Sequence, residues 1–272
     1  DTFFYNPAAC IAPSVTGVSS PATCFGASDG SVDITVSGGL PPYTITWSNG
    51  SNSEDIFGLI AGSYTVTVSD AANCPATITF VVAEPGNIIG AGFITNVTCN
   101  GYLDGSIDLT VSGGTSPYSI TWSNGALTED ISGLAAGVYT VTIIDNNSCA
   151  GQSMFTLIDP PVFSVTLSGV DPGCTGASTG SVTATATGGM APYSYFWNTT
   201  ATTSSISGVP AGIYNVVVVD SFGCGLSEYF TLTDPAPFTL SVISSTDVDC
   251  FGGSTGAIDI AASNDPISPA SN

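Results

Sequence analysis

Short segments in which apolar and polar residues alternate recur along the whole chain. Every second residue is apolar in residues 31–36, and the same alternation returns in 43–47 and 64–68; residues 77–82 resemble a final strand. Such alternation places the apolar side chains on one face of a strand, as in antiparallel sheets with one solvated side. Glycine-rich and asparagine-containing turns separate the segments, and no window of ten residues has helical periodicity. We therefore predict an all-β chain of short antiparallel strands.

The strand pattern itself repeats with a period of 75 residues. The run SDGSVDITVSGGLPPYTITWSNG at 28–50 returns as LDGSIDLTVSGGTSPYSITWSNG at 103–125. A more divergent copy, STGSVTATATGGMAPYSYFWNTT, occupies 178–200. Each copy contains six or seven short alternating segments, which predict a small β-sandwich for each repeat.

An acidic residue followed by proline closes each copy. Because a residue before proline favours extended geometry and proline cannot join a central strand, we place the repeat boundaries there. A further copy begins after the third but lacks the later motifs, so we expect the chain to be a fragment of a longer secreted protein. The predicted domains are an N-terminal segment (1–13), three complete repeats (14–85, 86–160 and 161–235) and an incomplete fourth repeat (236–272).

The charged residues are of one sign. The chain has no lysine, arginine or histidine and carries 21 acidic residues. Histidine-based catalysis is therefore excluded, and nucleic acid, whose phosphates need basic side chains, is an implausible partner. Since 43% of the residues are hydrophobic and only 8% are charged, the chain can still bury a core. We expect no insertion into a membrane.

Seven of the eight cysteines follow the same repeat in two series, and Cys10 lies outside both. None forms the close C-x-x-C pair that is typical of zinc sites, so we predict disulfides and a location outside the cytosol. Within a repeat the two cysteines are 50 residues apart, and a disulfide closing such a loop stabilises the fold by about 4 kcal/mol. Cys10 and Cys250 remain as unpaired or intermolecular candidates. The predicted pairs are Cys24–Cys74, Cys99–Cys149 and Cys174–Cys224.

The aromatic residues also keep the repeat. One tryptophan per repeat lies on the apolar face of its strand, so we predict a core position, with a platform for sugars as the alternative. One tyrosine per repeat follows Ala-Gly and is expected to anchor the same core, with its hydroxyl at the rim. Phe57 and Phe196 lie outside the apolar phase and are candidates for external contacts. The tryptophans are Trp47, Trp122 and Trp197, and the tyrosines are Tyr64, Tyr139 and Tyr214.

Carboxylates are the remaining candidates for chemistry. Calcium is the hard cation that clustered carboxylates would hold, and Glu84, Asp159 and Asp234 at the repeat boundaries are its candidate ligands; a solvated acidic surface is the alternative, and no other cofactor is expected. The acid pair at 54–55 recurs at 129–130. Neighbouring strand residues point to opposite faces, and the third repeat has Ser204-Ser205 instead. We therefore expect no enzyme, and no catalytic residues.

The combined motifs resemble a known family. The run C-x4-DGS-[VI]-D-x-TVSGG-x-x-PY-x-I-TWSNG, followed by ED-I-x-G-L-x-AG-x-YTV and D-x-x-x-C, is similar to the SprB-type repeat of Bacteroidota. The resemblance implies immunoglobulin-like sandwiches, strung like beads, in very large cell-surface adhesins, including gliding-motility adhesins exported by type IX secretion. The third repeat departs from the pattern, since it has Thr179 and Thr183 where the others have aspartates.

The resemblance leads to an expected function. We predict a structural stalk or filament segment of a secreted adhesin, located outside the cell at its surface. Its partners would be neighbouring repeats, like subunits or a surface polysaccharide. One alternative is a filament subunit that exchanges strands at the incomplete fourth repeat. The other is a carbohydrate-binding module, which would need exposed aromatic side chains.

Overall fold

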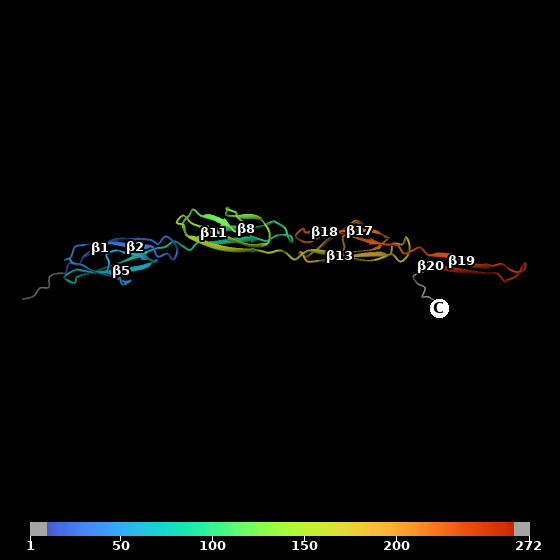
Figure 1. Ribbon diagram of the computed structural model, residues 1–272, viewed down its shortest axis with the longest axis horizontal. Coiled ribbons are helices and arrows are strands. Elements are labelled where there is room, and N and C mark those ends of the chain that lie inside the picture. Colours follow the sequence, from blue (N-terminus) through green and yellow to red (C-terminus); the bar gives the residue numbers. More distant parts are fainter. Residues whose placement is uncertain (1–9, 264–272) are drawn as a thin grey trace, which may run out of the picture. The chain divides into compact units, whose positions relative to one another are not determined.

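The computed structural model describes residues 10–263 (Figure 1). Within this range all the regular structure is β, in agreement with the prediction. By their contacts the residues group into two compact units. The first runs to residue 96 and resumes at 103–158, and the second holds 97–102 together with the chain from 159 onward. A short piece of the second repeat, 97–102, thus belongs with the third repeat.

Six strands form the first repeat, and they make two antiparallel three-stranded sheets. The strand order is β1-β2-β4 in one sheet and β3-β5-β6 in the other. β1 pairs with β2 along its whole length, from Ser14 opposite Ser37 to Ser20 opposite Ser31. The strands are β1 (Ser14–Ser20), β2 (Gly30–Ser37), β3 (Thr44–Trp47), β4 (Ile56–Leu59), β5 (Gly62–Ser69) and β6 (Pro75–Val82).

The next two repeats have the same strands in the same order. The second consists of β7 (Ile89–Thr95), β8 (Gly105–Ser112), β9 (Ser119–Trp122), β10 (Ile131–Leu134), β11 (Gly137–Ile144) and β12 (Ala150–Leu157). The third consists of β13 (Ser164–Val170), β14 (Gly180–Thr187), β15 (Ser194–Trp197), β16 (Ser205–Val209), β17 (Gly212–Val219) and β18 (Gly225–Leu232). Of the fourth repeat, the described residues form one hairpin, β19 (Thr239–Thr246) and β20 (Ala257–Ser263).

Each complete repeat buries its own core between its two sheets. In the first repeat Val32 and Ile34 of one sheet meet Trp47, Val66 and Val68 of the other. The alternating pattern produces this arrangement, because every second side chain of a strand points to the same face.

No helix of the described residues has the length and the hydropathy that crossing a bilayer requires.

The predicted aromatic anchors are part of these cores. Trp47, Trp122 and Trp197 are buried, and the indole N–H of Trp47 donates to the carbonyl of Ser53 at 2.9 Å. Because the rings are buried, they offer no face on which a sugar could stack. The hydroxyl of Tyr64 donates to the carbonyl of Ile60 at 2.9 Å, and this bond recurs in both other repeats. The core prediction for the tryptophans and the rim position of the tyrosine hydroxyls are confirmed.

The third repeat keeps its core volume through a paired exchange that the sequence analysis missed. In the second repeat Gly92 of β7 lies opposite Leu109 of β8. At the equivalent positions of the third repeat, Leu167 lies opposite Ala184. The large side chain has moved from one strand to its neighbour. Since interiors are close-packed, such an exchange preserves packing where a single change would not.

Candidate functional site at the repeat junctions

A five-residue turn between the last two strands of each repeat is held by an aspartate. In the first repeat Oδ1 of Asp70 accepts the backbone N–H groups of Ala72 and Cys74, each at 2.9 Å, and Oδ2 accepts that of Leu40 at 3.0 Å. Aspartate commonly organises turns by binding backbone donors in this way. We call this element, with the sequence Asp-x-x-x-Cys, the socket turn; it comprises residues 70–74, 145–149 and 220–224.

The socket aspartates are buried carboxylates whose pKa is lowered from its ordinary value. Burial by itself raises the pKa of Asp145, but the backbone N–H groups of Cys149, Thr115 and Asn147 outweigh it and lower the pKa below its ordinary value. In the third repeat a side chain on Gly189 would lie 2.6 Å from Oδ2 of Asp220. The Gly-Gly turn therefore gives the carboxylate the space it needs to reach its donors.

A second loop, between the first two strands of each repeat, carries the other cysteine. In the first repeat the carbonyl of Cys24 accepts the N–H of Ala27 at 3.1 Å. Gly26 has a φ of 71°, in the left-handed region that glycine adopts freely. We call this element the plug loop; it comprises residues 21–29, 96–104 and 171–179.

The boundary acids hold the plug loops. Glu84 accepts the backbone N–H of Gly26 at 2.6 Å. Asp159 and Asp234 accept the equivalent glycines, Gly101 and Gly176, each at 3.1 Å. They were the candidate calcium ligands, and the described residues contain no group of three or more side chains that could hold a metal ion. In this structure the three acids act on the plug loops through hydrogen bonds, and calcium binding stays a prediction.

The plug loop of one repeat is bonded to the socket turn of the next. Cys24 forms a disulfide with Cys149, and Cys99 forms one with Cys224. Both bonds join cysteines 125 residues apart. The predicted pairs within repeats, Cys24–Cys74, Cys99–Cys149 and Cys174–Cys224, are therefore wrong.

The length of one strand explains the error. The socket turn precedes β6 (Pro75–Val82), whereas the plug loop lies beyond its far end, where Ala22 donates to the carbonyl of Ala83 at 2.9 Å. Eight extended residues span about 26 Å, and a disulfide needs Cα atoms within about 7 Å. The two cysteines of one repeat thus sit at opposite ends of the sandwich, and the partner of every bonded cysteine comes from outside its own repeat.

The remaining cysteines also differ from the prediction. Cys10, predicted to be unpaired or intermolecular, is bonded to Cys74 of the first socket turn. Cys174, predicted to be paired, is free and exposed in the third plug loop. Cys250 is free and exposed as well, and an intermolecular bond at this cysteine stays a prediction.

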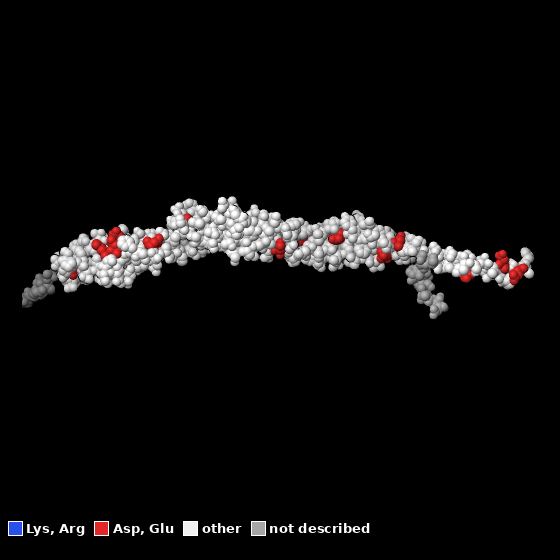
Figure 2. All heavy atoms as spheres, viewed as in Figure 1, with Lys and Arg blue, Asp and Glu red and all other residues white. Residues whose placement is uncertain are grey.

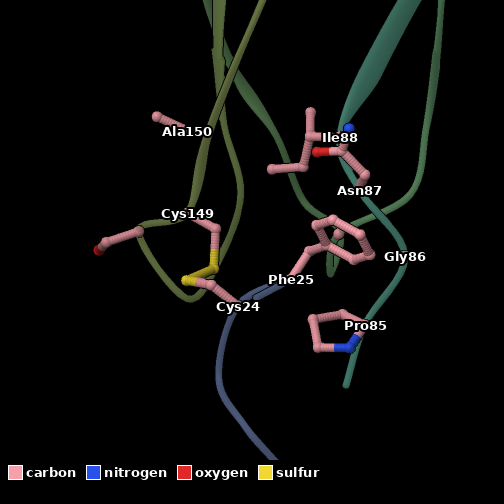
Figure 3. Close-up of a pocket in the computed structure, with 10 residues that line it drawn as sticks. Cys24, Phe25, Pro85, Gly86, Asn87, Ile88, Cys149 and Ala150 are labelled. Carbon is pink, nitrogen blue, oxygen red and sulfur yellow. A yellow bond between two sulfur atoms is a disulfide. The ribbon is translucent and has the colours of Figure 1, made fainter. Parts of the chain in front are cut away.

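The junction of the first two repeats has further contacts inside the first unit. The side chain of Asn147 donates to the carbonyl of Thr23 at 3.2 Å, which ties the socket turn to the plug loop beside the disulfide. Figure 3 shows the ring of Phe25 next to Pro85 and Gly86 in the hollow that the linker forms with the Cys24–Cys149 bond. The plug loop is therefore held by a covalent bond, a hydrogen bond and apolar contact.

The sequence of the repeats decides the family. The model of the SprB repeat matches residues 16–52, 91–127 and 166–202. The chain carries three SprB repeats. This is the repeat of Bacteroidota gliding adhesins, and the three matches recur at the 75-residue period. No curated protein matches the sequence.

Solved structures with several immunoglobulin domains are similar to the SprB repeats in fold. The N-terminal eight domains of Down Syndrome Cell Adhesion Molecule align at 17% identity over 83% of this chain and 37% of that one, with a TM-score of 0.39. Domains 1–5 of Sidekick-1 align at 14% identity over 82% and 59%, also with a TM-score of 0.39. Three domains of the Hoc capsid protein of bacteriophage RB49 align at 18% identity over 81% and 97%, with a TM-score of 0.40. The chain covers less than two thirds of the first two structures. Each of the three SprB repeats is a sandwich of two three-stranded antiparallel sheets.

The aspartate of the acid pair has a structural role in the first two SprB repeats. Asp55 accepts the backbone N–H of Ile34 at 2.9 Å, and Asp130 accepts that of Leu109 at 2.9 Å. In the third repeat the equivalent N–H, of Ala184, donates to the backbone carbonyl of Ser204 at 2.8 Å. A backbone acceptor thus replaces the carboxylate, which explains how the third repeat tolerates Ser204-Ser205.

A similar replacement occurs in the plug loops. Asp29 of the first repeat binds both the backbone N–H and the hydroxyl of Thr23, and these bonds lower its pKa. In the third repeat the hydroxyl of Thr179 accepts the equivalent N–H, of Gly173, at 3.1 Å.

Elsewhere the surface is sparsely charged. Figure 2 shows the acidic residues in small separate groups, with no basic residue among them.

Proposed function

We propose that residues 14–235 form part of the stalk of a large secreted adhesin, which holds a more distant binding region away from the bacterial surface. The SprB match supports this role, and gliding adhesins with such repeats suggest export by type IX secretion. The repeats would serve through their number and their connection rather than through a site of their own.

The covalent junction is the observation that carries the proposal. Each complete repeat buries a core of its own, and the plug loops of the first two repeats are bonded to the following repeat through Cys24–Cys149 and Cys99–Cys224. A module whose most specialised feature is its disulfide attachment to the next module is suited to act as a spacer. A ligand-binding module would instead have its specialised loops on a surface that no neighbouring repeat covers.

A competition experiment tests the stalk role. Cells that display the parent adhesin are allowed to attach to their substratum in the presence of a large excess of the purified oxidised chain. A stalk segment leaves attachment unchanged, while antibodies raised against the chain label intact cells. Strong inhibition of attachment by the chain would assign ligand binding to the repeats, and intact cells without label would exclude a surface location.

A second candidate function, a self-assembling subunit, has one observation in its favour. Ile258 and Ile260 of β20 are 72% and 56% exposed, whereas their counterparts in β14, Val182 and Ala184, are buried in the third core. Leu240 and Val242 of β19 lie opposite Ala262 and Ile260 and are also exposed. A sheet from a second copy could cover this face. Light scattering decides between the candidates: mass growing with concentration favours assembly, and a constant mass near 27.2 kDa excludes it.

A further inference from the structure

The disulfides create covalent routes through the chain that are much shorter than the backbone. Each inter-repeat bond joins cysteines 125 residues apart. Between the end of one bond and the start of another the backbone is short: Cys74 and Cys99 are 25 residues apart, and so are Cys149 and Cys174. Such a 25-residue segment contains only the last strand of one repeat, the linker and the first strand of the next.

We infer that the disulfides divide the chain into two covalent tracks that carry tension side by side and leave the middle of the first two repeats outside the load path. The first track runs from Cys10 through the bond to Cys74, along β6 and β7 to Cys99, and through the bond to Cys224. The second track runs from Cys10 along β1 to Cys24, through the Cys24–Cys149 bond and along β12 and β13 to the free Cys174, and from there along the backbone of the third repeat.

The tracks make the oxidised chain almost inextensible between Cys10 and Cys224. The shortest covalent route contains 25 backbone steps and two disulfides whose Cα atoms are 5.7 and 5.8 Å apart. Fully stretched, this route measures roughly 100 Å, at about 3.4 Å per residue. The 214 residues of backbone between the same cysteines would reach about 730 Å. In addition, 15 of the 25 residues already lie in extended strands, β6 and β7.

In the first two repeats the four middle strands lie outside both tracks. In the first repeat these are β2 to β5, which contain Trp47 and the exposed Phe57. In the second repeat they are β8 to β11. Tension on the two tracks passes through the first and last strands of a repeat, so these middle strands and the surface they present stay folded while the chain is pulled. The disulfide connectivity thus shields the middle strands from tension, a property that a passive spacer does not need.

Single-molecule stretching of the whole chain between handles at its two ends tests the tracks. The measured quantity is the contour length at high force, which covalent connectivity sets whether or not a variant folds with full stability. A reductant should lengthen the oxidised chain by 189 residues, which is about 640 Å.

Two serine variants that each lose one inter-repeat disulfide form a matched pair. Cys99→Ser breaks the first track, and its shortest route grows from 25 to 89 residues, a gain of about 220 Å. Cys24→Ser leaves the first track intact, so its contour length stays that of the unmodified chain. Equal lengthening of both variants, about 170 Å each, is the result that pairing within repeats produces, and it would overturn the inference.

Discussion

The carboxylate of Asp145 accepts a hydrogen bond from the backbone N–H of Cys149 at 2.9 Å, and the sulfur of Cys149 is bonded to Cys24 of the preceding repeat. The acid therefore positions the cysteine that joins two repeats. Asp70 and Asp220 stand in the same relation to Cys74 and Cys224. The repeated Asp-x-x-x-Cys motif thus encodes a junction rather than a surface charge.

Replacement of Asp145 by asparagine should destabilise the second repeat in a pH-dependent way. The hydrogen bonds from Cys149 and two further backbone donors hold the pKa of Asp145 below its ordinary value of 3.8. An aspartate whose pKa is lower in the folded chain than in the unfolded chain stabilises the fold at every pH above its unfolded pKa. This stabilisation is lost as the pH falls below about 4 and approaches the pKa of the folded chain. We expect Asp145→Asn to lower the Tm by several degrees at pH 6, and the difference from the unmodified chain to narrow below pH 4.

The control for this prediction removes a charge elsewhere on the same repeat. Asp108 lies at an exposed position of β8. Since the chain carries a formal charge of −21, removing any carboxylate relieves some repulsion, and Asp108→Asn should leave the Tm unchanged or slightly raised. Equal destabilisation by the two variants, or a constant effect of Asp145→Asn between pH 3 and 6, would contradict the assigned role.

The exchange between Leu167 and Ala184 predicts a strong coupling in the third core. Ala184→Leu alone adds volume opposite Leu167 and should destabilise by about 1–3 kcal/mol. Leu167→Gly alone leaves a cavity and costs about 2–5 kcal/mol. The double variant restores the pairing of Gly92 and Leu109 in the second repeat, so it should be clearly more stable than the sum of the single changes predicts. Chemical unfolding of the four proteins measures the coupling, and additivity within about 0.5 kcal/mol would refute the exchange.

Two thiols should react when the native oxidised chain is treated with a maleimide. They belong to Cys174 and Cys250, which are free and exposed. Cys174→Ser should therefore reduce the mass increase to one label. Cys10→Ser should raise it to three, because it releases Cys74. If Cys10→Ser instead lowered the number of labels to one, Cys10 would be a free thiol and the first track would not exist.

The tryptophan fluorescence should be that of buried rings. Trp47, Trp122 and Trp197 are at most 5% exposed, so the native emission should be blue-shifted relative to the reduced and unfolded chain, and acrylamide should quench it poorly. Addition of the parent organism's surface polysaccharide should leave the emission unchanged. Saturable quenching by the polysaccharide would support the carbohydrate-binding alternative and would require one of these rings to be accessible.

The strands and the cores could be predicted from the sequence because they depend on local alternation. Val66 and Val68 are buried at every second position of β5, as a period of two requires. The hydrogen-bonding roles of Asp55 and Asp70 were missed. In a chain with many acidic residues, a carboxylate is expected to be solvated unless the backbone N–H groups that it binds are known. The regular recurrence of Asp70, Asp145 and Asp220 four residues before a cysteine was the available signal.

The disulfide partners were mispredicted for a different physical reason. Two cysteines in one repeat were assumed to be neighbours, although the eight-residue strand β6 separates Cys74 from the plug loop of Cys24. That strand could be read from the sequence, and its length of about 26 Å already argues against a bond. What the sequence does not contain is the contact with the following repeat, which depends on how the linker continues from β6 into β7.

A disulfide map of the oxidised chain tests the junction most directly. Free thiols are first blocked with a maleimide. Because the chain has no lysine or arginine, trypsin cannot cut it, so it is digested without reductant by pepsin or an Asp-specific protease and analysed by mass spectrometry. We predict crosslinked peptides that contain Cys24 with Cys149 and Cys99 with Cys224. Peptides that join Cys24 to Cys74 and Cys99 to Cys149 would contradict the covalent junction, and with it the two tracks.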